Sequence, residues 1–545
     1  MSFNLAVILR ETAAAAPDRP VALYPAGRLS YAELDALSDR LAAGLESAGV
    51  RPGDAVGLQL PNIPQFLIAY FGILKCGGIA VPLNVMLKAP EVAFQLADSA
   101  ATILITWAGI LDEAAEGAAS AGVGAIYAVG QQATVGQQAT VGQQAADGQQ
   151  AANGQQAADG GPPGGGPAAG VAPFEQLLAA PGTRYPMARR AAADTAVVVY
   201  TAGTTGRPKG AMLTHLQLYM NADIPGRLFG VRPDDVVITV LPLFHVFGLS
   251  SIVNVCVRFG CAMSLIPRFD PAVVLAAIER DRATIFEGVP AMFLGLLSCP
   301  DLDQYDVSSL RVAISGGASI PAPALDAFEK HFGVVILEGY GMTETASTTT
   351  FNLSASQRRV YSVGKPIWGT ETQVWDSAGQ PLPPGREHVG EIVTRGLHVM
   401  KGYLNDPEAT AQVFSGEWLH TGDLGYFDGD GFLFIAGRKK ELIIRGGYNV
   451  YPREIEDVLA AHPSVAEAAV VGIPDERLGE EVMAVITVRP GATAGEADLR
   501  SYCRERLAAY KYPRVFEFRD VLPKNTLGKV LKDELAPGRT GAAAR

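Results

Sequence analysis

The sequence predicts an α/β protein with a large N-terminal domain of mixed and parallel sheets with flanking helices, and a small α+β C-terminal domain. Strand-like and helix-like segments alternate along most of the chain. This alternation is typical of largely parallel sheets, whose ligands bind at the carboxyl ends of the strands. The length of 545 residues also exceeds what one compact core usually takes. The pattern changes after Gly437, so we place the domains at residues 1–437 and 438–545.

The elements of the large domain follow from its apolar pattern. Residues 55–60 (AVGLQL) predict a strand, residues 64–77 (PQFLIAYFGILKCG) a helix, and residues 78–84 (GIAVPLN) the next strand. Residues 334–341 (VVILEGYG) predict a strand that runs into a glycine turn.

The small domain mixes helices and strands at shorter spacing. Residues 452–462 (PREIEDVLAAH) predict an amphipathic helix with proline at its start. Strands are expected at residues 466–473 (AEAAVVGI) and 481–488 (EVMAVITV), followed by a helix at residues 495–510 (GEADLRSYCRERLAAY).

A repeat interrupts the large domain. Between residues 130 and 159 the chain reads GQQATV, GQQATV, GQQAAD, GQQAAN and GQQAAD, and then runs into GGPPGGGP. A six-residue period can indicate a β-helix, but that fold needs a bulky apolar residue in each turn, and most units here offer alanine. We therefore expect a flexible, low-complexity insertion at about residues 130–167. Lengthening a loop from about 6 to about 40 residues costs only about 1.7 kcal/mol of closure entropy.

Composition limits the classes of partner. The net charge of −12 argues against nucleic-acid binding, which needs clustered lysine and arginine. Five scattered cysteines without a CxxC pair, and histidines without zinc-ligand spacing, predict reduced thiols and no structural metal. The apolar stretches predict neither a signal peptide nor an integral membrane segment. We expect a cytoplasmic protein, and the sequence leaves a homodimer open.

One loop carries a clear chemical signal. Residues 200–210 (YTAGTTGRPKG) crowd glycines, threonines, an arginine and a lysine behind an apolar run. Glycines let backbone N–H groups approach an anion, hydroxyls add donors and Lys209 adds charge, so phosphate is the expected ligand. The loop is not a Walker A motif, because Pro208 directly before Lys209 prevents a helix from starting there. Taken alone, an ordinary glycine–threonine turn is an equal alternative.

The loop and its surroundings resemble the adenylate-forming superfamily, which comprises acyl-CoA synthetases, adenylation domains and luciferases. Residues 200–215 (YTAGTTGRPKGAMLTH) are similar to its phosphate loop, with Ala202 in place of the usual serine. Seven further motifs follow in the family's order: LPLFHVFGL (241–249), ISGGASI (314–320), EGYGMTET (338–345), GEIVTRGLHVMKGYLNDPEAT (390–410), HTGDLG (420–425), GRKKELIIRGGYNVYPREIE (437–456) and PKNTLGKVLK (523–532). The resemblance covers nearly the whole chain except the repeat.

The resemblance implies a nucleotide site. The β- and γ-phosphates would lie in the phosphate loop, on Thr201, Gly203, Thr204, Thr205, Gly206 and Lys209. Adenine would lie against the backbone of Gly316, Gly317 and Ala318 and against the segment Glu338, Gly339, Tyr340 and Gly341, with the Tyr340 ring stacked on it. Asp423 would accept both ribose hydroxyls, a task suited to a carboxylate, with Arg438 in support. Taken singly, an aspartate in TGD is usually a turn residue and Tyr340 could belong to the core.

The resemblance also implies the catalytic groups. Glu344 would coordinate Mg²⁺ and Thr343 would lie near the α-phosphate, although a Thr–Glu pair alone is usually a helix cap. Lys529 matches the family's adenylation lysine. His245 would lie near the substrate carboxylate at the mouth of the pantetheine channel, and satisfied packing is its rival interpretation.

The resemblance also implies a mechanism in which one mobile small domain serves two half-reactions in turn. Lys440 would be the hinge about which this domain rotates, and Gly446 and Gly447 would line the CoA channel, where side chains would obstruct. We expect an ATP-dependent acid–CoA ligase that binds ATP, Mg²⁺, CoA and a small-molecule carboxylic acid. The lining of the acid pocket, near residues 287–289 and 346–349, favours a medium- or long-chain fatty acid. The alternatives are an aryl-acid ligase of the coumarate or benzoate kind and, in another class, a non-catalytic nucleotide-binding sensor.

Overall fold

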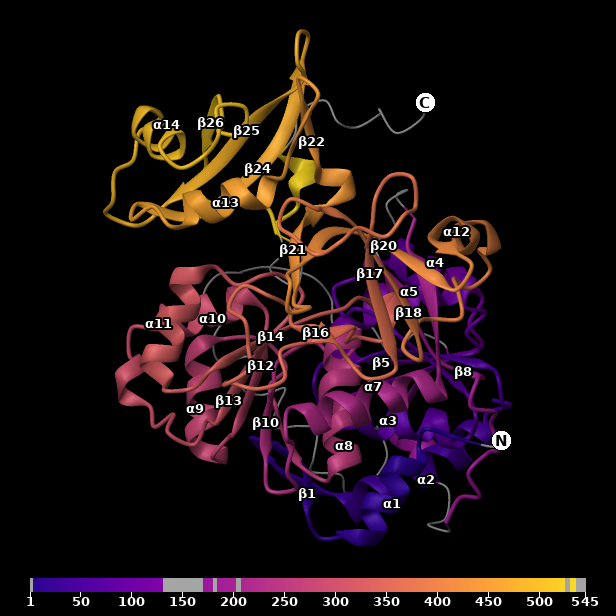
Figure 1. Cartoon of the computed structure of the whole chain (residues 1–545). Coiled ribbons are helices and arrows are strands. Elements are labelled where there is room, and N and C mark those ends of the chain that lie inside the picture. Colours follow the sequence, from indigo (N-terminus) through magenta and orange to yellow (C-terminus); the bar gives the residue numbers. More distant parts are fainter. Residues whose placement is uncertain (1–2, 131–169, 180–183, 202–206, 525–529, 536–545) are drawn as a thin grey trace, which may run out of the picture.

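The computed structural model describes residues 3–130, 170–179, 184–201, 207–524 and 530–535. They form a large body of sheets and helices with a smaller body above it (Figure 1). This architecture confirms the predicted α/β fold with a large N-terminal and a small C-terminal domain.

A nine-stranded sheet forms one half of the large domain, in the order β16-β15-β14-β13-β12-β10-β11-β1-β2. From β1 to β14 neighbouring strands run parallel, and β2, β15 and β16 are antiparallel additions at the two edges. The strands are β1 (Pro20–Tyr24), β2 (Gly27–Ser30), β10 (Val236–Thr239), β11 (Ala262–Leu265), β12 (Ile285–Gly288), β13 (Val312–Ser315), β14 (Ile336–Tyr340), β15 (Thr350–Phe351) and β16 (Lys365–Pro366). The parallel order brings the carboxyl ends of β10, β13 and β14 to one edge, where three of the quoted motifs begin.

A seven-stranded sheet forms the other half, in the order β7-β6-β5-β3-β4-β8-β9. Its strands are β3 (Ala55–Gln59), β4 (Ile79–Pro82), β5 (Ile103–Trp107), β6 (Ala125–Val129), β7 (Val171–Pro173), β8 (Thr195–Thr201) and β9 (Lys209–Thr214). The antiparallel pair β8–β9 sets Thr201 opposite Lys209 at the two ends of the phosphate loop. The insertion connects β6 to its parallel neighbour β7 at the sheet edge, and the repeat itself lies outside the described residues.

Helices cover both sheets. They are α1 (Val7–Ala15), α2 (Tyr31–Ser47), α3 (Pro64–Lys75), α4 (Ala89–Asp98), α5 (Leu111–Ala121), α7 (His215–Leu228), α8 (Val255–Phe259), α9 (Pro271–Asp281), α10 (Pro290–Leu297), α11 (Ala322–Phe332) and α12 (Pro407–Val413), with a π-helical segment η3 (Phe247–Asn254). Short 3₁₀ turns complete the chain: η1 (Ala108–Ile110), η2 (Phe174–Leu178), η4 (Leu302–Gln304), η5 (Thr343–Thr345), η6 (Lys439–Glu441) and η7 (Lys532–Glu534). Local signals set several starts: Ser30 and Glu33 form a capping box for α2, and proline opens α3, α9, α10, α12 and α13.

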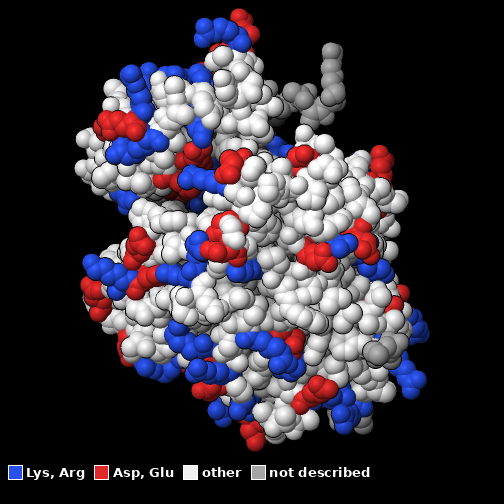
Figure 2. Space-filling model, viewed as in Figure 1, with Lys and Arg blue, Asp and Glu red and all other residues white. Residues whose placement is uncertain are grey.

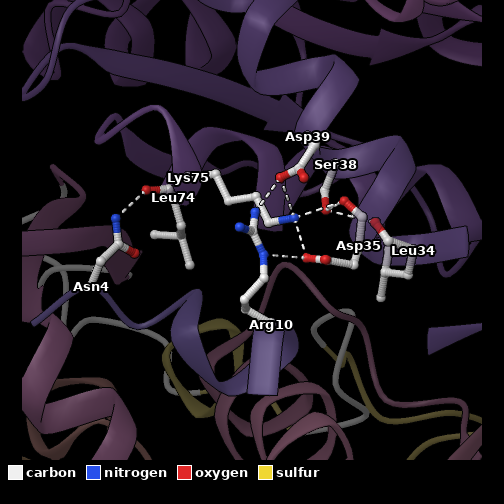
Figure 3. Close-up of polar contacts among 8 residues, drawn as sticks. All are labelled: Asn4, Arg10, Leu34, Asp35, Ser38, Asp39, Leu74 and Lys75. Carbon is white, nitrogen blue, oxygen red and sulfur yellow. Dashed lines mark hydrogen bonds and ion pairs between the residues drawn. The ribbon is translucent and has the colours of Figure 1, made fainter. Parts of the chain in front are cut away.

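A buried ionic cluster fixes the first three helices (Figure 3). Lys75 at the end of α3 is fully buried, and its Nζ lies 2.5 Å from Asp35 Oδ1 and 2.8 Å from Asp39 Oδ1 on α2. Arg10 of α1 pairs with the same two carboxylates. Burial lowers the pKa of Lys75, an effect that the two carboxylates oppose.

A five-stranded antiparallel sheet leads out of the large domain. It contains β17 (Thr370–Trp375), β18 (Gly390–Gly396), β19 (Phe414–Ser415), β20 (Trp418–Phe427) and β21 (Leu433–Arg438). Figure 1 shows β20 and β21 rising toward the smaller body.

The small domain has its own sheet and core. Its strands are β22 (Ile443–Arg445), β23 (Tyr448–Val450), β24 (Val465–Asp475), β25 (Gly479–Val488) and β26 (Val515–Phe518), and its helices are α13 (Pro452–Ala460) and α14 (Glu496–Arg504). Apolar residues between 443 and 516 form a core cluster separate from the clusters of the large domain. The helix expected over residues 495–510 ends at Arg504, because the chain turns there so that Tyr512 packs in the same core as Leu499 and Cys503.

Two further features bear on partners. Among the described residues, no helix has the length and apolar character needed to cross a membrane. Figure 2 shows lysines and arginines interspersed with acidic residues over the visible face, and the surface is hollowed on the left between the small and large domains. That face carries no broad basic patch of the kind a nucleic-acid backbone needs.

Candidate active site

Tyr340, Asp423 and Arg438 meet where the two expected nucleotide motifs approach each other. The hydroxyl of Tyr340, at the end of β14, donates to Asp423 Oδ2 at 2.7 Å. Arg438 is the cross-strand partner of Asp423 in the β20–β21 pair, and its Nε lies 3.3 Å from Asp423 Oδ1. Burial raises the pKa of the Tyr340 hydroxyl well above its usual range, so the phenol stays a hydrogen-bond donor.

The glycines after β13 are required by close approach. A Cβ on Gly316 would lie 3.1 Å from ring atoms of Phe247, and Gly317 has a φ of +78°. Gly341 is tighter still, because a Cβ there would lie 1.4 Å from the Ser347 carbonyl oxygen. Gly316 therefore lets the loop after β13 pack on Phe247, and Gly341 lets the segment after β14 fold back on Ser347.

Glu338 has a supporting position. Its carboxyl is buried, and Oε1 accepts a 3.4 Å hydrogen bond from the Ile320 backbone N–H, which ties β14 to the loop that follows Ala318. Burial raises the pKa of Glu338 to about 7. Gly339, Tyr340 and Gly341 line a cavity beside it.

Glu344 and Lys209 are joined through Tyr403. The Tyr403 hydroxyl donates to Glu344 Oε1 at 2.8 Å, and Lys209 Nζ lies 5.3 Å from the centre of the Tyr403 ring. Burial raises the pKa of Glu344, and the hydrogen bond from Tyr403 opposes that rise. Thr343 is the neighbouring residue in η5 and is buried.

Residues 399–404, which we call the Tyr403 strap, hold this arrangement in place. The Met400 N–H donates to the Glu344 carbonyl at 2.8 Å, and the Leu404 N–H donates to the Gly210 carbonyl at 2.7 Å. The strap therefore connects the start of β9, just after the phosphate loop, to η5. Tyr403 lies inside the motif at residues 390–410. No local pattern predicts it as a site residue, because its partner Glu344 lies 59 positions away.

Glu344 suits Mg²⁺ as a single protein ligand. Mg²⁺ prefers hard oxygen donors, and it is usually bound by one or two carboxylates together with substrate phosphates and water. No group of three or more His, Cys, Asp or Glu side chains with metal-site geometry occurs in the described part of the chain. A carboxylate held beside the phosphate loop fits the phosphate-dependent kind of site.

His245 is a neutral imidazole between two cavities. Its Nδ1 accepts a 3.2 Å hydrogen bond from the Phe247 N–H, so the neutral ring carries its proton on Nε2. Burial lowers the pKa of His245 to about 4. Both cavities share His245, Phe247 and Gly317 in their lining.

One of these two cavities lies at the nucleotide loops, and we call it the acid cavity. It is lined by Phe229, His245, Val246, Phe247, Ser251, Glu287, Ile314, Ser315, Gly316, Gly317, Gly339, Tyr340, Gly341, Met342, Ser347, Thr348 and Phe351. Of the positions expected to line the acid pocket, near residues 287–289 and 346–349, Glu287, Ser347 and Thr348 line this cavity, and Val289 lines the other one.

Family models match both domains. Residues 9–404 match the model described as AMP-binding enzyme, and residues 454–529 match that of the AMP-binding enzyme C-terminal domain. The chain belongs to the AMP-binding enzyme family. It is an AMP-forming acid–CoA ligase of the adenylate-forming superfamily, with ATP and CoA as co-substrates.

Relatives of this AMP-binding enzyme act on several acids. The long-chain-fatty-acid–CoA ligase of Bacillus subtilis (strain 168) is 35% identical over 98% of this chain and 95% of its own. The feruloyl-CoA synthase of an Amycolatopsis species is 36% identical over 93% of both chains. Among solved structures, the anthranilate CoA ligase AuaEII in complex with anthranoyl-AMP has a TM-score of 0.87 at 28% identity, covering 98% of this chain and 96% of that one. ATP-bound MatB from Rhodopseudomonas palustris has a TM-score of 0.86 at 33% identity, covering 98% of both chains.

Several expected site residues of this AMP-binding enzyme fall outside the described part. Gly203, Thr204, Thr205 and Gly206 of the phosphate loop and the expected adenylation lysine, Lys529, are among them. The described residues on the two sides of each of these segments pair with each other. Thr201 lies opposite Lys209, and Lys524 forms an isolated β-bridge with Val530.

The hinge region carries its own ion pairs. Lys440 lies in η6, and its Nζ is 3.9 Å from Asp533 Oδ2. Close by, Lys532 Nζ lies 3.0 Å from Glu441 Oε2 and 2.7 Å from Glu456 Oε1. These pairs hold the chain that follows residue 529 against the hinge and against α13.

Gly446 and Gly447 lie away from the site in this arrangement. They form the turn between β22 and β23, and the Gly446 N–H donates to the Leu478 carbonyl at 2.7 Å, at the tip of the β24–β25 hairpin. Figure 1 shows this hairpin pointing away from the large domain, whereas α13 lies on the facing side. The structure therefore brings the nucleotide residues together and keeps the two channel glycines apart from them.

Proposed function

We propose that this acid–CoA ligase activates a medium- or long-chain fatty acid at the acid cavity, using the residues named above. The observation that carries the proposal is one cavity lined by both the neutral His245 and Tyr340, whose hydroxyl donates to Asp423. Met342 of the same lining lies two positions before Glu344, which Tyr403 connects to Lys209.

In the first half-reaction a carboxylate oxygen attacks the α-phosphorus of ATP. The bond from the α-phosphorus to the bridging oxygen breaks, and pyrophosphate leaves with the electron pair. Such a step needs positioning and charge neutralisation more than covalent help. Asp423 and Tyr340 would position the ribose and adenine, and Lys209 and Lys529 would meet the phosphate and developing charge.

Glu344 is the group on which the metal would be held, and a bound Mg²⁺ supplies positive charge at the phosphate oxygens. The chain's own contribution is to keep the Glu344 carboxylate ionised. The Tyr403 hydrogen bond favours that form against burial.

His245 would orient the substrate. With Nδ1 occupied by the Phe247 N–H, the Nε2–H group is the donor left for an acid carboxylate. Because burial holds the pKa of His245 at about 4, the ring neither gains nor loses charge near neutral pH. It therefore acts as a fixed donor, without transferring a proton.

In the second half-reaction the thiol of CoA attacks the acyl carbon of the adenylate, AMP leaves, and the thiol proton passes to solvent. The thiol must reach the acyl carbon through a path free of side chains. Rotation of the small domain about Lys440 would bring Gly446 and Gly447 to line that path. Their present position on the far side of the small domain fits a state that precedes this rotation.

Two observations support a medium- or long-chain fatty acid as the substrate: the lining of the acid cavity and the similarity to the Bacillus subtilis ligase. Phe229, Ile314, Met342 and Phe351 present apolar surface, and no arginine or lysine lines the cavity to hold a second carboxylate. Each methylene buried in such a cavity contributes up to about 0.8 kcal/mol.

An aromatic acid is the second candidate, and a specific observation favours it. Three phenylalanines, Phe229, Phe247 and Phe351, line the acid cavity, and the rings of Phe229 and Phe351 lie 4.2 Å apart. Flat ligands stack well on such rings. The names of the feruloyl-CoA and anthranilate relatives, beside that of the Bacillus subtilis ligase, show that this family includes enzymes for both kinds of acid.

One panel experiment separates these candidates. Straight-chain acids of increasing length, benzoate and cinnamate are each tested for CoA-dependent release of AMP and pyrophosphate. For a fatty-acid ligase, kcat/KM should rise with chain length and then level off or fall. Higher kcat/KM for benzoate or cinnamate than for every straight-chain acid would identify the aryl candidate. ATP binding without release of pyrophosphate with any acid would instead identify the nucleotide-binding sensor.

A further inference from the structure

Glu287 is a buried carboxyl group in the lining of the acid cavity. It lies in β12, opposite Ile314 of β13, near the carboxyl ends of both strands. Its side chain is 3% exposed, and its Oε2 atom has no hydrogen-bond partner among the described residues. The neighbouring lining is formed by phenylalanine, isoleucine and small polar side chains, and within the described part of the chain it includes no lysine or arginine.

Other buried carboxyl groups of the large domain are satisfied. Glu344 accepts from Tyr403, Glu338 accepts from the Ile320 N–H, and Asp235 accepts from Arg311 and Thr284. A buried polar atom left unsatisfied costs about 1–3 kcal/mol, and such atoms are rare in native proteins. Glu287 differs from these three carboxyl groups in two ways. Its Oε2 atom lacks a hydrogen-bond partner among the described residues, and its side chain lines the acid cavity.

Burial raises the pKa of Glu287 well above its usual range. Burial therefore favours the neutral carboxylic acid, which has one O–H donor and a carbonyl acceptor. Such a group complements a hydroxyl or an amino group, each of which can donate and accept. It has little affinity for a methyl or methylene group, whose arrival would leave the carboxyl unpaired.

Glu287 shares one cavity with the residues at which the acid would react. The acid carboxylate would lie beside the nucleotide loops, near Gly341 and His245. Glu287 lines the same cavity from β12, and Phe229 and Phe351 line it from other elements. A substrate that fills the cavity would therefore meet Glu287 as well as the phenylalanines.

We propose that Glu287 selects an acid that bears a hydroxyl or amino group, which pairs with the Glu287 carboxyl when the reacting carboxylate lies at the nucleotide. The proposal rests on the acid–CoA ligase activity and narrows its substrate class. It applies to a fatty chain and to an aromatic ring, because the recognised feature is the polar substituent. Sites that hydrogen-bond such a group reject analogues that lack it far more strongly than apolar pockets reject an extra methylene.

Matched pairs of acids test the proposal. The pairs are benzoate with its 3- and 4-hydroxy and 3- and 4-amino derivatives, cinnamate with 4-hydroxycinnamate, and octanoate with 3-hydroxy- and 8-hydroxyoctanoate. The readout is the ratio of kcat/KM for the substituted acid to that for its parent, measured as acid-dependent pyrophosphate release. We expect at least one substituted acid to exceed its parent by about tenfold or more in the natural chain.

Two variants assign the preference to the carboxyl group. Glu287→Leu replaces it with apolar surface, so the ratio should fall to about one or below and kcat/KM for the parent acids should rise. Glu287→Gln keeps a donor and an acceptor at nearly the same volume, so it should retain most of the preference. Glu279→Leu, which removes an exposed carboxylate from α9, is the matched control and should leave the ratio unchanged.

The outcomes separate this inference from the ligase activity itself. A natural chain that processes the parent acids as well as or better than every substituted partner would overturn the inference and leave the ligase intact. So would a Glu287→Leu variant that keeps the full preference. Absence of acid-dependent pyrophosphate release with all acids would contradict the proposed function. If Glu287→Leu does not fold, as judged by ATP binding and thermal unfolding, the smaller replacement Glu287→Ala takes its place: loss of the preference for the substituted acid supports the assignment, and a fully retained preference opposes it.

Discussion

At the scale of single residues, Tyr403 shows how one side chain serves two functional groups. Its hydroxyl donates to Glu344, and its ring lies beneath the Lys209 ammonium. The contact joins residues 59 positions apart in the sequence. The phenol therefore positions the expected metal ligand and the phosphate-loop lysine relative to each other, without itself touching substrate.

Replacement of Tyr403 by Phe should shift the acid limb of the pH profile. The variant keeps the ring beneath Lys209 and loses the hydrogen bond that lowers the pKa of Glu344. Burial then acts with less opposition, the pKa of Glu344 rises, and a higher pH is needed to ionise it. We expect the acid limb of pyrophosphate release to move to higher pH and the Mg²⁺ concentration for half-maximal ATP binding to rise several-fold.

The matched control for that variant is Tyr185→Phe. Tyr185 also donates to a glutamate, Glu46, at 3.0 Å, but the pair lies outside the site residues described above. Its removal should leave the pH profile and the Mg²⁺ requirement unchanged. An acid limb and a Mg²⁺ requirement that are the same in Tyr403→Phe and the natural chain would show that Tyr403 has only a packing role.

At the scale of secondary-structure elements, the ionic cluster of Figure 3 determines how α1, α2 and α3 pack. Lys75 ends an otherwise apolar, buried helix, and Asp35 and Asp39 project from α2 toward it. Paired buried charges contribute little net stability, whereas a partner left alone in the interior is strongly destabilising. The cluster is therefore sensitive to the loss of any one member.

Lys75→Met should lower the free energy of unfolding by about 3–5 kcal/mol, because Asp35 and Asp39 would share one remaining cation, Arg10. Adding Asp39→Asn to Lys75→Met should recover part of that loss, because one buried carboxylate is removed. The comparison variant Lys88→Met breaks an exposed pair with Glu113 and should leave the unfolding midpoint unchanged. Urea unfolding followed by circular dichroism measures all three. Equal midpoints for Lys75→Met and Lys88→Met would contradict the role of the cluster.

At the scale of the whole molecule, the two half-reactions place conflicting demands on one small domain. Lys532 is held near the expected hinge by its ion pairs to Glu441 and Glu456, and Gly447 lies on the far side of the domain. One orientation cannot present both ends of the domain to the same cavity. Rotation about Lys440 is the movement that would exchange them.

Two variants should therefore damage different steps. Lys529→Ala removes a cation aimed at developing charge, which should reduce adenylation by about 10²–10³-fold and barely affect CoA transfer from a supplied acyl-adenylate. Gly447→Phe should block the thiol's path while pyrophosphate is still released. Each half-reaction is measured separately in both variants.

Backbone strain at Gly447 has its own control. Its φ of +84° disfavours any side chain, whatever the space around it. Gly491 has a similar φ of +77° and open surroundings, so Gly491→Phe introduces the same strain elsewhere in the small domain. Equal damage to both half-reactions in Lys529→Ala and Gly447→Phe would mean that these residues act through folding, and the rotation account would fail.

The sequence by itself determined the fold class and the order of the motifs. Strands β3, β4 and β14 and helices α3 and α13 lie where the apolar pattern predicts them. The apolar runs of β3 and α3 are continuous, α13 is amphipathic, and both helices start with proline. The loops expected to hold phosphate, adenine and ribose stay predictions, drawn from motifs with short, fixed spacing. The contact between Asp423 and Arg438 can be predicted only if the pairing of β20 with β21 is also known.

Only the tertiary structure decided which distant side chains meet. Tyr403 with Glu344, Lys75 with Asp39, and the missing partner of Glu287 depend on the packing of elements far apart in the sequence. The orientation of the small domain, with Gly446 turned away from the acid cavity, likewise depends on a few ion pairs around a hinge. Local periodicity encodes whether a residue is buried. The partner of a buried polar group is set by three-dimensional packing, which a pattern along one chain does not contain.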